Sequence, residues 1–251
     1  MRSLKWYKSL SLAKERNLEG FFLVEGQRAV GQILQRFPDA VNEILVSNTF
    51  AERSLETFKS PRVLTDTQFG SISTSRTPQG IIAVVKIPPD YSSIDVPAVP
   101  GTKILLLEHI QDPGNVGTLV RTAAALDYDG VILSDQCADL FSPKTVQATA
   151  GALLSLWSRR TSKYTDLIRS LISNGYTMCA AEVNGNSHVD FSKLSRHIIA
   201  LGNEGAGLSK EILSLAQIRF RIPFNSSNVE SLNVAVSGAI AMFAGANNTG
   251  W

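Results

Sequence analysis

Three short segments of this sequence are rich in polar side chains that could take part in chemistry. The first holds Asn115 and Arg121 after an Asp-Pro-Gly turn, and the second holds Glu204 within a run of glycines. The third holds Ser231 and Asn233, in front of an apolar stretch of small residues. Amides, a carboxylate, a hydroxyl and a guanidinium can together orient a polar ligand, stabilise charge and help a proton leave. The three segments therefore indicate candidate positions for ligand binding or catalysis.

Each segment, taken alone, also has an ordinary structural explanation. Asn115 can be the N-cap of a helix over residues 116–126, and Arg121 can be a solvated surface charge. Because these two residues are six positions apart, both reach one cleft only if Arg121 extends back along the helix. The glycine run at 202–207 can be a tight turn, since it matches neither the dinucleotide fingerprint nor the P-loop. Ser231 can cap an exposed loop.

The polar segments lie next to short aliphatic runs that predict buried strands. The runs in the second part of the chain cover residues 104–107, 131–133, 176–181, 198–201 and 220–222. Helix-compatible stretches separate them, and Ser209 is expected to cap one of these helices. Continuous aliphatic strands of this kind are typical of a mostly parallel sheet with helices on both faces. Ligands of such sheets bind beyond the carboxyl ends of the strands.

A proline-rich segment at residues 87–101 divides the chain into two units. It contains four of the ten prolines and has no helical or strand period, so we expect a linker there. Before it, apolar runs at 21–24, 44–46, 63–64 and 81–87 alternate with helical patterns. One of these patterns places five apolar residues on one helix face: Ala29, Val30, Ile33, Leu34 and Phe37. The expected fold is α/β, with a smaller unit over residues 1–95 and a larger one over residues 96–251.

Composition argues against disordered, membrane-spanning, secreted and disulfide-rich proteins. The 251 residues are 44% hydrophobic and 18% charged, which is typical of a folded, soluble protein. The weakly polar stretch 234–246 is shorter than the roughly 18 apolar residues of a membrane span, and the charged N-terminus lacks a secretory signal. Cys137 and Cys179 are expected to be buried free thiols, and three widely spaced histidines disfavour a metal site. We therefore expect a cytoplasmic protein without a metal.

Positive charge is concentrated near the N-terminus. Residues 1–36 contain seven basic and three acidic side chains, a net charge of +4, whereas the whole chain carries +2. Trp6, Tyr7, Phe21 and Phe22 lie among these bases, which suits phosphate contacts combined with base stacking. Alternatively, the aromatic residues belong to the core and the bases form a solvated helix face. Both interpretations stay open at this point.

Taken in order, the three polar segments resemble the signature motifs of the SpoU (TrmH-like) family of RNA ribose 2′-O-methyltransferases, within the SPOUT class. The matching stretches are PGNVGTLVRTAAALDYDGVIL, ALGNEGAGLS and IPFNSSNVESLNVAV, within residues 104–245. Near the N-terminus, FFLVEGQRAV and RTPQGIIAVV resemble the family's ribosomal-protein-L30e-like substrate-binding domain. The resemblance covers nearly the whole chain.

The resemblance implies a trefoil knot in the mostly parallel C-terminal domain, S-adenosylmethionine as the cofactor, and a homodimer. It also implies an RNA substrate, and the two-domain form favours ribosomal RNA. The residues whose motif positions contact the cofactor are Gly202, Asn203, Gly205, Ile222 and Leu232. Those whose motif positions line the methyl-transfer site are Asn115, Arg121, Glu204, Ser231 and Asn233.

These residue types agree with the chemistry. A ribose 2′-hydroxyl is a poor nucleophile, whereas a methyl group on a sulfonium is already activated by the positive charge. The enzyme must mainly hold the oxygen in line with the S–CH₃ bond and help its proton leave, which needs neither metal nor covalent intermediate. Because the pKa of arginine lies above about 12, Arg121 is interpreted as an electrostatic partner of the hydroxyl and the adjacent phosphate.

Other functions are weighed against this one. A nucleotide-dependent oxidoreductase is disfavoured because no glycine fingerprint follows the first strand. The alternatives that remain are a transfer RNA 2′-O-methyltransferase and a non-catalytic RNA-binding or assembly protein, although a binding protein would have no chemical need for the five site residues.

The sequence departs from the family pattern in one short segment. The family commonly has a glycine and one residue fewer where this chain has residues 225–228, so Ile222 and Leu232 are the firmer cofactor contacts there.

Overall fold

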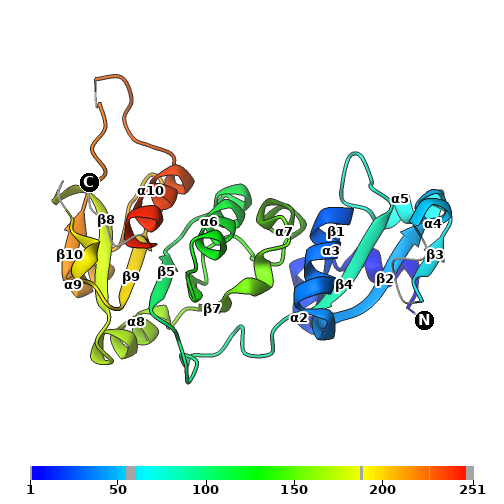
Figure 1. Ribbon diagram of the computed structural model, residues 1–251, viewed down its shortest axis with the longest axis horizontal. Helices are drawn as coiled ribbons and strands as arrows, with labels where there is room; N and C mark the ends of the chain where they lie inside the picture. The colour runs from blue at the N-terminus through cyan, green and yellow to red at the C-terminus, as the bar shows by residue number, and fades with distance from the viewer. Residues whose placement is uncertain (1, 55–59, 187–188, 226, 247–251) are drawn as a thin grey trace. The chain divides into compact units, whose positions relative to one another are not determined.

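The computed structural model describes residues 2–54, 60–186, 189–225 and 227–246 (Figure 1). Contacts divide the chain into two compact units. The first comprises Met1–Pro89 with Asp139–Leu154, and the second comprises Asp90–Ala138 with Ser155–Trp251. No helix or strand lies between residues 86 and 103, so the predicted linker is confirmed. The division into functional domains at residues 95 and 96 stays a prediction.

The first unit is built on a four-stranded sheet in the order β1-β4-β2-β3. Its strands are β1 (Phe21–Glu25), β2 (Val41–Ser47), β3 (Arg62–Leu64) and β4 (Ile81–Lys86). Strand β4 runs antiparallel to both of its neighbours, whereas β2 and β3 are parallel. The α-helices of this unit are α1 (Leu4–Ser9), α2 (Ala13–Glu19), α3 (Gln27–Arg36), α4 (Asn48–Ser54), α5 (Asp66–Ile72) and α7 (Pro143–Thr149). All four predicted strands are confirmed.

The N-terminal aromatic residues belong to the core of this unit. Tyr7 and Phe22 are fully buried, and Trp6 and Phe21 are half-buried and pack against the core cluster that contains Tyr7. Trp6 meets both Tyr7 and Phe21 in edge-on contacts. Tyr7 and Phe22 are therefore unavailable for stacking on bases. For these two residues, the core interpretation is confirmed and the base-stacking interpretation is wrong.

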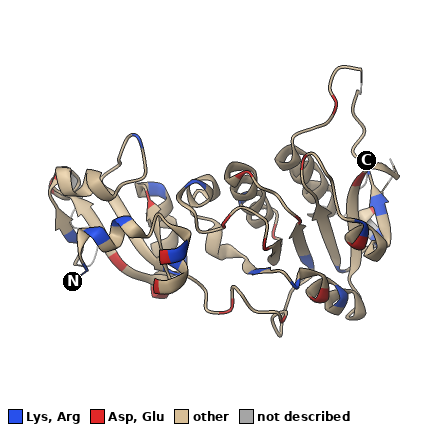
Figure 2. Ribbon diagram, turned by 180° about the vertical axis from the view of Figure 1, so that it is seen from behind, with Lys and Arg blue, Asp and Glu red and all other residues tan. Residues whose placement is uncertain are grey.

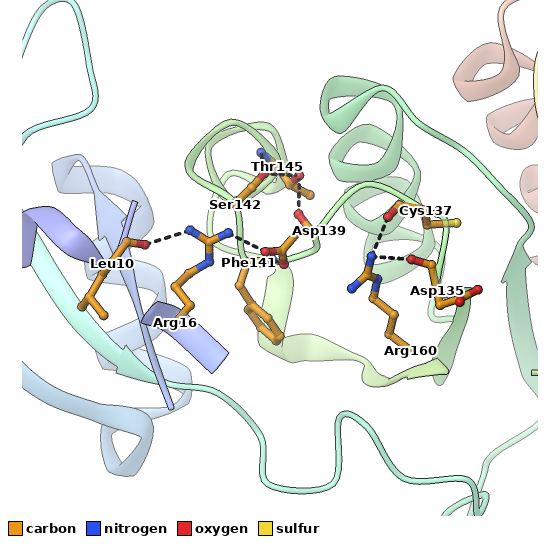
Figure 3. Close-up of polar contacts among 9 residues, drawn as sticks. All are labelled: Leu10, Arg16, Asp135, Cys137, Asp139, Phe141, Ser142, Thr145 and Arg160. Carbon is orange, nitrogen blue, oxygen red and sulfur yellow. Dashed lines mark hydrogen bonds and ion pairs between the residues drawn. The ribbon is translucent and has the colours of Figure 1, made fainter. Parts of the chain in front are cut away.

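A buried arginine holds the segment 139–154 in the first unit. Arg16, on α2, is 2% exposed and forms an ion pair with Asp139 (Figure 3). A second nitrogen of its guanidinium donates to a backbone carbonyl at 2.8 Å. The ring of Phe141 lies 4.8 Å from that of Phe22, centroid to centroid. Arg16 is thus a structural residue and not part of the exposed basic surface that the first 36 residues suggest.

The second unit contains a six-stranded sheet in the order β10-β8-β9-β5-β6-β7, with every neighbouring pair parallel. The strands are β5 (Lys103–Leu107), β6 (Gly130–Ser134), β7 (Trp157–Thr161), β8 (Thr177–Asn186), β9 (His197–Leu201) and β10 (Ile218–Phe220). The predicted, mostly parallel sheet is confirmed. Strand β7 escaped prediction because the edge strand WSRRT has no aliphatic run, and β10 ends two residues earlier than expected.

Helices cover both faces of this sheet (Figure 1). They are α6 (Pro113–Ala125), α8 (Tyr164–Ser173), α9 (Lys210–Leu215) and α10 (Val234–Ala246). Short 3-10 helices lie at Pro38–Ala40, Leu153–Ser155 and Phe191–Lys193. Helix α10 packs closely, since a Cβ on Gly238 would lie 2.2 Å from Leu119 of α6 and 2.6 Å from Leu201 of β9. Across the described ranges, no helix combines the length and apolar character of a membrane span.

Both cysteines are buried free thiols in the second unit, as predicted. Burial raises the pKa of the Cys179 thiol to about 12 and also raises that of Cys137. Because the thiolate is the reactive form, burial makes both side chains poor nucleophiles. Within the described residues, no group of three or more His, Cys, Asp or Glu side chains is arranged to hold a metal ion.

A buried histidine begins β9 and faces the end of α10. His197 is 1% exposed, and its Nε2 lies 3.2 Å from the hydroxyl of Tyr128. Its Nδ1 has no hydrogen-bond partner among the described residues. A Cβ on Gly245 of α10 would lie 2.8 Å from the Tyr128 hydroxyl and 2.9 Å from Nε2 of His197, so the helix packs closely here. Burial, with a smaller contribution from Lys103, lowers the pKa of His197 to about 4.

The pKa of His197 predicts that acid destabilises the second unit. An unfolded histidine has a pKa of 6.5, so between pH 6.5 and 4 the unfolded chain binds a proton that the native protein does not. The stabilising effect is complete above pH 6.5 and is lost as the pH falls towards 4. From pH 7 to pH 5, His197 should cost about 2 kcal/mol of unfolding free energy.

Urea unfolding at pH 7 and pH 5 measures this effect. His197→Gln serves as the control, because it keeps every other titrating group of the protein. The variant should lose less unfolding free energy than the parent, by the amount assigned to His197. Equal losses in the two proteins would contradict the prediction.

Candidate active site

Three loops extend from the carboxyl ends of strands in the second sheet. Residues 108–112 follow β5 and lead into α6, whereas residues 202–209, the glycine-rich loop, follow β9. Since β5 and β9 are neighbouring parallel strands, these two loops begin side by side. Residues 221–233 follow β10 and lead into α10, which packs against α6 and β9. Polar segments far apart in the sequence are thus brought to the edge where parallel sheets bind ligands.

Two side-chain hydrogen bonds, called here the amide chain, link the first turn of α6 to the loops 202–209 and 221–233. Asn115 Nδ2 donates to Glu204 Oε1 at 2.6 Å, and Asn233 Nδ2 donates to Asn115 Oδ1 at 3.2 Å. Asn233 Oδ1 accepts from the backbone N–H groups of Ala235 and Val236, at 2.9 and 3.3 Å. Because the oxygen of Asn233 caps α10, its nitrogen must face Asn115, and this directs the Asn115 nitrogen towards Glu204. The helix cap therefore sets the direction of the whole chain of bonds.

The interpretation of Asn115 as a helix N-cap is wrong. Asp112 caps α6: its carboxylate accepts from the backbone N–H of Asn115 at 2.9 Å, and Pro113 begins the helix. Asn233 caps α10. The Asn115 side chain is thereby free to join the amide chain. The predicted cap at Ser209 is confirmed, since its hydroxyl accepts from a backbone N–H of α9.

A cavity of about 350 Å³ opens at the glycine-rich loop. Glu204 and Ser231 lie in its wall. So do all five residues predicted to contact a cofactor, namely Gly202, Asn203, Gly205, Ile222 and Leu232. Apolar side chains complete the lining, among them Leu201, Leu208 and Phe224. The volume falls within the range of about 300–1,000 Å³ that small-molecule sites occupy.

Internal hydrogen bonds hold the glycine-rich loop in a compact conformation. Asn203 Oδ1 accepts from the backbone N–H groups of Gly205 and Ala206, at 2.9 and 3.0 Å. Asn203 Nδ2 donates to a backbone carbonyl at 3.0 Å, so the Asn203 amide is engaged within the protein although the residue lines the cavity. A Cβ on Gly202 would lie 2.3 Å from the carbonyl carbon of Gly207, which leaves no room for a larger residue.

Arg121 stands apart from the amide chain. It is exposed on α6 and makes no hydrogen bond or ion pair within the described part of the chain. The structure therefore joins Asn115, Glu204 and Asn233 directly and places Ser231 in the cavity wall. It does not bring Arg121 into contact with them.

Residues 225–228, where the sequence departs from the family pattern, form a local turn. Asn225 Oδ1 accepts from the backbone N–H of Ser227 at 3.0 Å, and the backbone N–H of Asn228 donates to the Asn225 carbonyl at 3.2 Å. Ser226 lies outside the described residues. Ile222 and Leu232, on either side of the turn, both line the cavity.

One buried carboxylate near the site was not singled out from the sequence. Glu108 is fully buried and accepts hydrogen bonds from Tyr164 and Ser209. The available signal was its place directly after the aliphatic run 104–107, where a charged residue is costly to bury without partners. Its partners come from distant parts of the chain and could not be read from that position.

Family models match both parts of the chain. The model described as the SpoU rRNA Methylase family matches residues 102–243, and the MRM3-like substrate binding domain matches residues 2–83. A relative from Bacillus subtilis, the 23S rRNA (guanosine(2553)-2′-O)-methyltransferase RlmP, is 32% identical over 245 residues. That alignment covers 96% of this chain and 95% of the relative.

Solved structures agree with these matches. A Porphyromonas gingivalis protein assigned to the TrmH family of RNA methyltransferases has a TM-score of 0.82 and 32% identity, with 98% of each chain covered. An AdoMet-bound rRNA methyltransferase from Sinorhizobium meliloti has a TM-score of 0.78 and 26% identity, with 97% of this chain and 93% of that chain covered. The resemblance inferred from the three motifs is confirmed, and the chain belongs to the SpoU rRNA methylase family.

Proposed function

We propose that this protein transfers a methyl group from S-adenosylmethionine to a ribose 2′-hydroxyl of ribosomal RNA. The observation that carries the proposal is the amide chain from Asn233 through Asn115 to Glu204, which ends at the wall of the 350 Å³ cavity. Two relatives, 32% and 25% identical, are named as 23S rRNA 2′-O-methyltransferases, which favours ribosomal over transfer RNA.

The lining of the cavity suits S-adenosylmethionine. Leu201, Ile222 and Leu232 provide apolar surface for the adenine ring, and the glycine-rich loop brings backbone groups close to the polar parts of a ligand. The loop leaves space there, because a Cβ on Gly205 would meet no atom closer than 3.6 Å. When bound, the cofactor supplies an electrophilic methyl group on a positively charged sulfonium. The carboxylate of Glu204 places an opposite charge in the same wall.

The protein's own side chains would bind and orient the ribose. Glu204 can accept a hydrogen bond from the 2′-hydroxyl, and Asn115 holds that carboxylate in place. Because the α10 cap already fixes the amide chain, little reorganisation is needed when RNA binds. Ser231 can donate or accept a hydrogen bond at the cavity wall. Arg121, with no partner among the described residues, is available to orient the hydroxyl and the adjacent phosphate.

The proposal includes a substrate-binding role for residues 1–95, with an L30e-like fold. The match of residues 2–83 to a substrate-binding domain model supports it. So do the Lys and Arg residues that Figure 2 marks in blue along several elements of the first unit. Six of the seven basic residues in the first 36 are exposed: Arg2, Lys5, Lys8, Lys14, Arg28 and Arg36. Exposed cations of this kind neutralise RNA phosphates.

The proposal also includes the family's trefoil knot, within residues 96–251, and a cytoplasmic location. The support for the knot is the match to the family, together with the packing of α10 against both α6 and β9, which Gly238 allows. A cytoplasmic location agrees with a substrate in bacterial ribosomes, such as the relative from Bacillus subtilis is named for.

A homodimer is the remaining part of the proposal. Helix α10 exposes a stripe of large apolar side chains at i, i+4 and i+7, namely Val236, Ile240 and Phe243, which are 49%, 38% and 60% exposed. Such a stripe on a helix that begins at the site is suited to packing against the same helix region of a second chain.

Mapping ribose 2′-O-methyl groups in total RNA, with and without the gene, tests the function. One ribosomal RNA site should lose its methyl group when the gene is deleted. A loss confined to transfer RNA would select the alternative substrate, and no loss would contradict the function.

Calorimetry with a chelator present should show one S-adenosylmethionine site per chain. Binding that requires added divalent metal would contradict the metal-free mechanism.

Arg121→Ala is expected to reduce methyl transfer by at least about 100-fold, with little change in cofactor affinity or unfolding free energy. The side chain is exposed and unbonded in this structure, so its contribution should lie in orienting the hydroxyl and phosphate. Arg121→Lys should recover little, because a point charge cannot replace the planar fork. Single-turnover methylation with saturating cofactor measures the effect, and the control is Arg169→Ala on α8, which removes an exposed arginine and its surface ion pair with Glu211. A near-parent rate for Arg121→Ala would show that Arg121 is an ordinary surface residue.

Light scattering at micromolar concentration should give twice the mass of one chain. Phe243→Asp is expected to shift the protein towards the monomer, because a charge would be buried in the α10 stripe. Leu18→Asp is the control, since Leu18 is an exposed apolar residue of the first unit, at 73%. A monomeric parent protein that still binds cofactor would contradict the homodimer.

A further inference from the structure

Glu108 is a buried carboxylate without a cationic partner among the described residues. It directly follows β5 and is 0% exposed. Oε1 accepts from the hydroxyls of Tyr164 and Ser209, at 2.6 and 2.7 Å, and Oε2 accepts from the backbone N–H of Ser209 at 2.7 Å. An ionised carboxylate is costly to bury, and these three donors are what offsets the cost. Two of the three come from the last residue of the glycine-rich loop.

The hydroxyl of Ser209 passes this contact on to the cavity wall. It donates to Glu108 and accepts from the backbone N–H of Ile212 at 3.2 Å, which caps α9. Leu208 precedes Ser209, Leu213 follows it on α9, and both line the cavity. The position of Ser209 therefore determines where this part of the wall lies.

The next residue, His109, holds the other end of the same loop. Its carbonyl accepts from Asn203 Nδ2 at 3.0 Å, and its backbone N–H donates to Ser134 at 2.9 Å. His109 has a φ of 57°, a left-handed conformation that is uncommon for a residue other than glycine. Glu108 and His109 thus hold the glycine-rich loop at Ser209 and at Asn203 respectively.

We infer that Glu108 is a positioning residue, which preorganises the glycine-rich loop for S-adenosylmethionine through Ser209 without touching the cofactor. The inference rests on the proposed function, since it assigns the loop to that cofactor. A loop bonded at both ends to adjacent residues of a buried strand end need not be ordered when the ligand binds. Loss of the anchor should therefore appear in cofactor affinity.

Calorimetry of the full-length protein with S-adenosylmethionine tests this role. Glu108→Gln replaces one accepting oxygen with a donating amide, so it cannot satisfy all three donors. Its dissociation constant for the cofactor should rise by about tenfold, and Ser209→Ala should have a similar effect. The double variant should bind about as weakly as the weaker single variant, because both changes break the same link.

Tyr164→Phe is the matched control. It removes a hydrogen bond from the same buried carboxylate but none from the loop, so affinity should stay within about twofold of the parent even where unfolding free energy falls. In turnover assays, KM for the cofactor should rise in Glu108→Gln while KM for RNA does not change.

Three outcomes would overturn the inference. One is parent-like cofactor binding by Glu108→Gln. Another is an equal loss of affinity in Tyr164→Phe, which would make the role of the carboxylate one of general stability. The third is parent-like cofactor binding by Ser209→Ala, which tests the inference if Glu108→Gln does not fold. Absence of binding by the parent protein would instead overturn the proposed cofactor, and the inference with it.

Discussion

An asparagine amide has one accepting end and one donating end, and the site depends on how Asn233 uses them. Its oxygen is occupied by the first turn of α10, so its nitrogen can only face Asn115. The direction of every later bond, up to the carboxylate of Glu204, follows from this choice. The cap in turn requires α10 to lie where Gly238 allows it, against α6 and β9. The packing of α10 therefore also fixes the direction of the hydrogen bonds at the site.

The strands were largely predictable from the sequence because they are buried on both faces and read as continuous aliphatic runs. Strand β7 was missed since an edge strand such as Trp157–Thr161 needs no such run. The interpretation of Asn115 as a helix cap failed for a different reason. Local sequence shows which residues can cap a helix, but the nearby Asp112 competes for the same role. Which of the candidates caps the helix is determined by the three-dimensional structure.

The candidate site, too, was predictable only in part. Motif spacing located the residues that line the cavity, because they follow strands whose carboxyl ends share one sheet edge. It did not indicate that the Asn203 amide is used inside the protein, nor that Glu108 is buried beneath the same loop. Such contacts join residues about 90 to 100 positions apart and leave no periodic trace in the sequence. The place of Arg121 relative to the ligand stays a prediction.

The segment 139–154 gives the first unit a discontinuous chain, and this affects the order in which the protein can be made. Residues 1–89 are synthesised before Asp139, so the two stretches of this unit are not made together. Until then the guanidinium of Arg16 lacks its carboxylate, and the ring of Phe22 lacks its contact with Phe141. The core of the first unit is therefore complete only after β5 and β6 of the second sheet have been synthesised. The first unit is thus completed by chain that lies beyond β5 and β6 in the sequence, although the two sheets are separate.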